Sequence, residues 1–156
     1  MPSRTELQTA LQQSRERFNA AVDGTDPSTL ENQAVCGVWS SRDVAGHLAD
    51  WNDELLAAAE FGTGRLPEAR PLVEDGEAYN TSHAEARKSQ SWSEARADLD
   101  ASFDRVSSVL EDLDEEQLSA AATMPWGVDG TVGEVFADIT GHVNEHVANL
   151  ENGLTR

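Results

Sequence analysis

Apolar residues recur every three or four positions in four separate stretches of the chain, which is the spacing of amphipathic α-helices. No stretch shows the alternation of a half-buried strand, and no glycine-rich nucleotide loop is found. The pattern therefore predicts an all-α protein, a four-helix bundle. The apolar positions of the four stretches are Leu7, Leu11, Phe18 and Val22; Val44, Leu48, Trp51 and Leu55; Leu99, Phe103, Val106, Leu110 and Leu113; and Val132, Val135, Ile139, Val143 and Leu150.

A candidate N-terminal cap stands directly before each stretch. A Ser or Thr is followed three residues later by Glu or Asp, which is the arrangement of a capping box. The first helix should run from about Ser3 to Val22, and the fourth from Thr131 to near Asn152 and Gly153, a suitable stop. The four cap pairs are Ser3 with Glu6, Ser40 with Asp43, Ser91 with Glu94, and Thr131 with Glu134.

The connection between the second and third helices, from Gly62 to Ser91, is long enough for a crossover rather than a tight turn. No linker or internal repeat divides the chain, so a single domain over residues 1–156 is expected. The expected minor elements are a short helix over Tyr79–Arg87, capped by Ser82 and Glu85, and helical turns after Asp26 and Asp114.

The charge of the chain is strongly acidic. Asp and Glu number 29 against 11 basic residues, a formal net charge of -18 over 156 residues. A polyphosphate backbone or an anionic membrane surface would be repelled by such a protein. Nucleic acid and membranes are therefore not expected as partners. The expected partner is a small-molecule substrate.

Cys36 is the only cysteine, so the chain can form neither an internal disulfide nor a cysteine-based zinc site. This usage favours a reducing, cytoplasmic location. Residues 1–22 contain no long apolar run, so neither a signal peptide nor a membrane span is expected there. Because no histidine or basic cluster adjoins it, Cys36 is expected to be a buried bystander rather than a nucleophile.

Three of the four histidines fall on the apolar faces. His142 and His146 are four residues apart on the fourth helix, so both rings project from one side and can grip one metal ion. His47 lies among the apolar residues of the second helix and should also point inward, where its ring needs a partner. A three-histidine site with open positions is typical of catalytic zinc, and neutral imidazoles also suit nickel, iron or copper. His83 is expected at the surface.

Carboxylates within one turn of these histidines could orient the rings as hydrogen-bond acceptors. Asp50 and Asp138 are the first candidates, ahead of Asp43 and Glu145, and the alternative for each is a solvated helix face. The histidines themselves have an alternative too, as packing residues bonded to helix neighbours such as Asp138.

The chain contains four tryptophans, as many as its phenylalanines, and a single tyrosine. Trp51 follows His47 by one turn, and Trp126 lies in the loop that enters the fourth helix. Both could wall a pocket for an apolar ligand, and the alternative is ordinary anchoring of the core and a loop.

Several of these residues also form a recognisable motif. Residues 38–51 read VWSSRDVAGHLADW, followed by Tyr79-Asn80, by Trp92-Ser93-Glu94, and by GHVNEH at 141–146. From about Leu7 to Leu150 the chain resembles the DinB/YfiT-like superfamily, and the first motif with the Tyr-Asn pair looks closest to its ClbS/DfsB branch.

The resemblance implies an up-down-down-up bundle in which His47, His142 and His146 bind a divalent transition metal, usually zinc or nickel, with solvent completing the shell. Some members of the superfamily are transferases or isomerases that use mycothiol or bacillithiol, and some form homodimers, so a homodimer is compatible with it. The ClbS branch includes a self-resistance protein that opens an electrophilic cyclopropane, a chemistry not tied to the three histidines.

Two classes of function follow. The leading hypothesis is a metal-dependent hydrolase or thiol-dependent transferase, in which the metal activates water or a low-molecular-weight thiol for attack on a small electrophile. The alternative is a non-catalytic metal or small-molecule binding protein of the ClbS type. A purely structural role of the histidines would instead predict that His142→Ala changes stability and not metal content.

Overall fold

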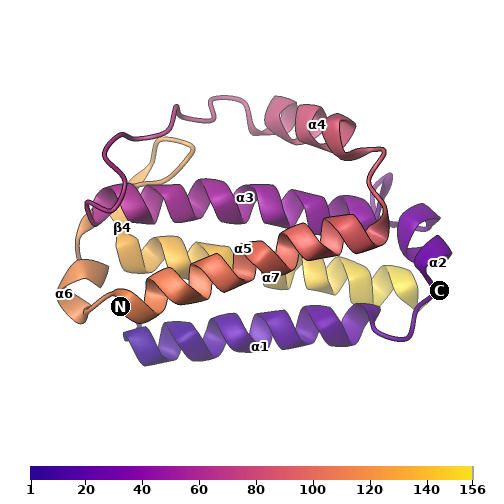
Figure 1. The fold of residues 1–156 in the computed structure, drawn as a ribbon, viewed down its shortest axis with the longest axis horizontal. Helices are drawn as coiled ribbons and strands as arrows, with labels where there is room; N and C mark the ends of the chain where they lie inside the picture. The colour runs from indigo at the N-terminus through magenta and orange to yellow at the C-terminus, as the bar shows by residue number, and fades with distance from the viewer. Residues whose placement is uncertain (156) are drawn as a thin grey trace.

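Four long helices form a bundle in the computed structural model, which describes residues 1–155. They are α1 (Arg4–Val22), α3 (Ser41–Gly62), α5 (Trp92–Asp112) and α7 (Val132–Leu154). In Figure 1, α1 and α7 run in one direction and α3 and α5 in the other. The helix α3 packs against both α5 and α7, and α1 packs against α7. The predicted four-helix bundle with up-down-down-up order is therefore confirmed.

The predicted caps set where the long helices begin. The hydroxyls of Ser3, Ser40 and Thr131 each accept a hydrogen bond from the backbone N–H three residues on, and the acidic side chain there returns a bond to the cap residue. Each reciprocal box satisfies donors that a helix N-terminus otherwise leaves unpaired.

The last helix ends at Leu154, close to the predicted end near Asn152 and Gly153, but Gly153 is not the residue that stops it. Gly153 lies inside its last turn, where a Cβ atom would come within 2.7 Å of the Val35 side chain. Glycine is used here because β1 (Ala34–Cys36) passes close to the helix, and not because the helix ends.

The long connection between α3 and α5 contains the expected extra helix, α4 (Gly76–Arg87). Its cap is Asp75, so it begins three residues before the predicted start at Tyr79, and Ser82 and Glu85 lie within it. In Figure 1, α4 lies along the outer side of α3. Two hydrogen bonds from Arg87 to Asp50, of 2.8 and 3.0 Å, join the two helices.

Short helices and strands occupy the remaining connections. The predicted helical turns are α2 (Pro27–Asn32), capped by Asp26, and α6 (Glu115–Leu118), capped by Asp114. The expectation that no strand forms is wrong. The hairpin of β1 with β2 (Trp39–Ser40) leads into α3, and the hairpin of β3 (Ala121–Thr123) with β4 (Asp129–Thr131) leads into α7. Strands of two or three residues are too short to show an alternating pattern.

The four apolar stripes meet in one buried cluster between the long helices. Phe18, Leu48, Phe103 and Val143 are each at most 1% exposed, one from each helix. Burying such stripes is the main source of stability for a bundle of this kind. No helix among residues 1–155 combines the length and the apolar character needed to cross a lipid bilayer.

Candidate metal centre

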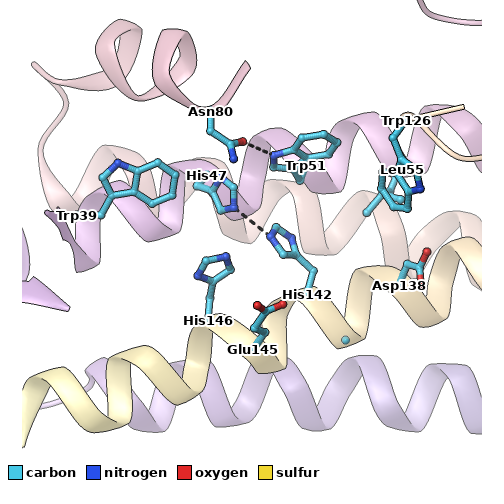
Figure 2. Close-up of a pocket in the computed structure, with 11 residues that line it drawn as sticks. Trp39, His47, Trp51, Leu55, Asn80, Trp126, Asp138, His142, Glu145 and His146 are labelled. Carbon is cyan, nitrogen blue, oxygen red and sulfur yellow. Dashed lines mark hydrogen bonds between the residues drawn. The ribbon is translucent and has the colours of Figure 1, made fainter. Parts of the chain in front are cut away.

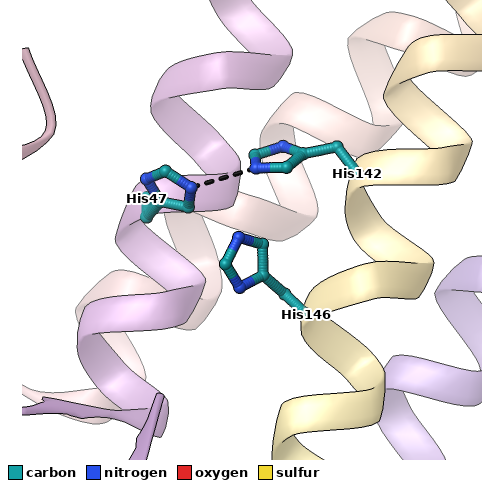
Figure 3. A group of neighbouring side chains, drawn as sticks. All are labelled: His47, His142 and His146. Carbon is teal, nitrogen blue, oxygen red and sulfur yellow. Dashed lines mark hydrogen bonds between the residues drawn. The ribbon is translucent and has the colours of Figure 1, made fainter. Parts of the chain in front are cut away.

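Three imidazole rings from two helices meet beside the core. His47 comes from α3, and His142 and His146 come from α7. Nε2 of His47 lies 3.0 Å from Nε2 of His142, and one nitrogen from each of the three rings lies within 4.8 Å of the others. Figure 3 shows the rings directed toward one another in the gap between the two helices.

The local sequence explains why these rings meet. The hairpin of β1 and β2 fixes the start of α3 at Ser40, and Leu48 and Val44 are fully buried, which leaves His47 at the edge of the core. On α7, Val143 and Val147 face the core, which puts His142 and His146 one turn apart at the same edge. Because α3 and α7 run antiparallel and pack together, the two edges face each other.

Burial keeps the rings uncharged at neutral pH. It lowers the pKa of His47 to about 3, with a further contribution from the neighbouring His142 and His146. It lowers the pKa of His142 to about 4, again with a contribution from His146. The pKa of His146 is lowered by burial as well, although Glu145 opposes the shift. All three rings therefore keep a lone pair available.

The residues present fit a divalent transition metal. Three neutral imidazoles whose nitrogens lie close together are the donor set that zinc, nickel or copper prefers. Within residues 1–155, the buried Nδ1 of His146 has no hydrogen-bond partner, so nothing in this part of the chain already satisfies that nitrogen. A buried polar ring without a partner is unfavourable, and a bound metal would relieve this.

The three histidines line a cavity of about 580 Å³ between α3, α4 and α7 (Figure 2). The structure places Trp51 and Trp126 on its wall, with ring centroids 6.3 Å apart. Trp51 is almost buried, whereas Trp126 is 47% exposed. The cavity is lined by Trp39, His47, Trp51, Leu55, Asn80, Trp126, Asp138, Gly141, His142, Glu145 and His146.

The two carboxylates expected to orient the histidines have different positions. Asp138 lines the cavity, and burial together with Glu134 raises its pKa. Asp50 instead forms the ion pair with Arg87 that holds α4. Within the described residues, neither carboxylate makes a hydrogen bond with a histidine ring. Glu145 is the second carboxylate on the cavity wall.

Two cavity residues, Trp39 and Asn80, were not predicted from the sequence. Trp39 precedes the cap of α3, and its ring centroid lies 4.8 Å from that of His47. Asn80 belongs to the Tyr-Asn pair of the motif, but no spacing rule connects α4 with the histidine faces.

His83, expected at the surface, is half-buried because it stacks on Tyr79 with centroids 3.8 Å apart. Cys36 is half-buried, and burial raises the pKa of its thiol.

A family model described as the DinB superfamily matches residues 10–150, which is most of the chain. The chain belongs to the DinB superfamily. The three histidines of this DinB-superfamily chain all lie within the matched residues, and so does every residue that lines the cavity. No curated protein matches the sequence at a significant level.

Solved structures share the DinB-type bundle at low sequence identity. A mycothiol-dependent maleylpyruvate isomerase has a TM-score of 0.81 at 15% identity over 96% of this chain, and this chain spans only 61% of the isomerase. YfiT from Bacillus subtilis, described as a “probable metal-dependent hydrolase”, has a TM-score of 0.71 at 20% identity, with 96% and 84% of the two chains covered. The colibactin self-resistance protein ClbS, solved with double-stranded DNA, has a TM-score of 0.66 at 14% identity, with 93% and 95% covered. At these identities the likeness shows the fold alone.

The depressed histidine pKa values predict a pH dependence of the metal-free DinB-type bundle. An unfolded histidine takes up a proton near pH 6.5, whereas His47 and His142 in the folded protein do so only near pH 3 and 4. Between these values the unfolded state binds more protons, so stability falls as the pH is lowered, and the dependence ends once the folded rings protonate. From pH 7 to pH 5, each of the two rings should cost about 2 kcal/mol of stability.

Urea unfolding at several pH values checks this prediction. Because many carboxylates also titrate in acid, the comparison is with a double variant, His47→Gln with His142→Gln, in which the loss of stability from pH 7 to pH 5 should be smaller. His83→Gln is the matched control and should behave like the parent. Equal losses in the parent and the double variant would contradict the prediction.

Proposed function

We propose that this protein is a metal-dependent enzyme in which His47, His142 and His146 hold a divalent transition metal, zinc or nickel. The site would activate water or a low-molecular-weight thiol for attack on a small electrophile. The observation that carries the proposal is the meeting of three neutral imidazoles at the wall of a cavity large enough for a small molecule.

A divalent metal bound by imidazoles lowers the pKa of a bound water or thiol and polarises an oxygen of the substrate. The chain's own residues would do the rest. Asp138 and Glu145, on the cavity wall, are placed to accept a proton, and burial, which raises the pKa of Asp138, makes it a stronger base than an exposed aspartate. The indoles of Trp51 and Trp126 would hold the apolar part of the substrate and exclude water from it.

Hydrolysis and thiol transfer are the two forms that this chemistry can take. Among the structural neighbours, one is an isomerase that depends on the thiol mycothiol, and YfiT is described as a “probable metal-dependent hydrolase”. Both forms need the same three ligands and an open cavity. They differ in whether the nucleophile is water or an added thiol, and activity on electrophilic probes with and without such a thiol distinguishes them.

A second candidate function is binding without turnover, as in a self-resistance protein of the ClbS type. The feature that favours it is the aromatic wall, which could retain an apolar molecule whether or not a metal is bound. Stoichiometric protection from a reactive compound, with no product released, would be its signature. Although ClbS was solved with DNA, the net charge of -18 here argues against that partner. A single domain and a cytoplasmic location complete the proposal.

Elemental analysis of untagged protein, purified without a chelator, tests the metal site directly. We expect close to one equivalent of zinc, nickel or another transition metal per chain, and loss of that metal in the double variant of His47→Ala and His142→Ala. Protein that is metal-free and also takes up neither added zinc nor added nickel would overturn the proposal and favour the metal-independent binder.

A further inference from the structure

The side-chain amide of Asn80 has a fixed orientation in the cavity. Trp51 Nε1 donates a hydrogen bond of 2.7 Å to Asn80 Oδ1. An indole N–H can only donate, so the atom that faces it must be the amide oxygen and the amide cannot be flipped. In Figure 2 the oxygen points at Trp51, and the amide nitrogen points to the side of the histidines.

The amide nitrogen of Asn80 is therefore a donor directed into the cavity. Asn80 lines the cavity, and within residues 1–155 its Nδ2 makes no hydrogen bond. An amide that already has its oxygen occupied retains two N–H groups for a ligand. A donor aimed into a partly apolar cavity favours ligands that present an acceptor and disfavours ligands that leave it unpaired.

The helix that carries Asn80 is held in place by its neighbours on both sides. Tyr79 packs against Trp51 with ring centroids 4.7 Å apart, and its hydroxyl donates to Glu54. At the C-terminal end of α4, Arg87 binds Asp50 through two hydrogen bonds. These contacts fix the donor before a ligand arrives, so little ordering free energy is needed on binding.

The charges of the cavity limit what can bind there. None of the residues that line it is a lysine or an arginine, whereas Asp138 and Glu145 are both carboxylates. Arg87, at the end of α4, already forms ion pairs with Asp50 and Asp98. The cavity wall therefore offers no cationic side chain to pair with a carboxylate or phosphate, and only a bound metal could do so.

We propose that Asn80 determines the specificity of this cavity, which takes a flat, apolar compound through its carbonyl oxygen and, while no metal is bound, disfavours anions. The Nδ2 group donates to the carbonyl oxygen while the indoles of Trp51 and Trp126 cover the apolar body. The inference rests on the proposed function, because it names the class of electrophile that the site would act on. A hydrogen bond at that oxygen also stabilises the negative charge that develops there when a nucleophile attacks the carbon.

The test compares three probes of nearly the same size: 2-acetylnaphthalene, 2-ethylnaphthalene and naphthalene-2-sulfonate. Dissociation constants are measured by quenching of tryptophan fluorescence in the parent, in Asn80→Leu and in Asn80→Asp. The aspartate variant keeps an oxygen for Trp51 to donate to and replaces the amide donor with a charged acceptor, whereas the leucine variant removes the donor without adding charge. Thr81→Ala, an exposed neighbour on α4, is the matched control.

The preference for the ketone over the hydrocarbon should be about fivefold larger in the parent and in Thr81→Ala than in either Asn80 variant, as expected for one neutral hydrogen bond. In protein freed of metal with a chelator, the sulfonate should bind at least about tenfold more weakly than the ketone, because it would face two carboxylates. An unchanged ketone preference in both Asn80 variants would overturn the donor role. Equal or tighter binding of the sulfonate would overturn the exclusion of anions.

The metal content of each sample separates this inference from the proposed function. Parent protein that takes up neither zinc nor nickel and still shows the Asn80-dependent preference would reject the metalloenzyme and keep the donor. Protein with one equivalent of metal and no Asn80-dependent preference would keep the metal site and reject the donor.

Discussion

Replacing His142 with alanine should lower the affinity of the protein for zinc or nickel by at least about 100-fold. The loss of a side chain that only orients a metal ligand costs about 10–100-fold, and the removal of a ligand must cost more. Nε2 of His142 lies 3.0 Å from Nε2 of His47, so His142 supplies one of the three converging nitrogens. Its removal would leave the metal with two imidazole ligands, those of His47 and His146. A titration against a chromophoric chelator measures the affinity.

The control for this variant is His83→Ala. His83 lies on α4, stacks on Tyr79 and belongs to no group of converging ligands. The parent and His83→Ala should have the same affinity for the metal. If His142→Ala changed the free energy of unfolding and left metal binding at the level of the parent, the histidines would be packing residues and not ligands.

The sequence predicted the long helices well because their stabilisation is local and periodic. Each long helix has 19 to 23 residues and carries a stripe of apolar residues, and each begins after a cap that satisfies its own helix. The role of Gly153 could not be predicted in this way, because the glycine is needed for the close approach of Val35, a residue far away in the sequence. The hairpins were missed because their pairing is tertiary and their strands span only two or three residues.

The residues of the candidate site also differ in whether the sequence alone could predict their positions. His142 and His146 share a helix, and His47 shares a face with apolar neighbours, so their convergence could be predicted from spacing alone. The position of Asp50 could not be, because its partner Arg87 comes from the end of a long connection. The position of Asn80 could not be predicted either, because it depends on how the long connection places α4 along α3.

Replacing Trp51 with alanine should destabilise the protein by about 3 kcal/mol, a typical cost for a large aromatic side chain in a packed interior. Trp51 is only 9% exposed. Its ring contacts Tyr79 on α4 and Trp126 in the loop before α7, so its loss would leave a void between three parts of the chain. Urea unfolding, followed by circular dichroism, measures the difference.

Two matched variants separate the contributions of this side chain. Trp51→Phe keeps most of the ring and removes the bond to Asn80 Oδ1, so it should cost only about 1 kcal/mol. Trp126→Ala removes a ring that is 47% exposed, and it should cost clearly less than Trp51→Ala. The expected order makes Trp51 a part of the fold that also forms the cavity wall, because one ring fills the interior and fixes the Asn80 amide. Equal losses of unfolding free energy for Trp51→Ala and Trp126→Ala would contradict this, because Trp51 would then contribute no more to the packed interior than the exposed Trp126 does.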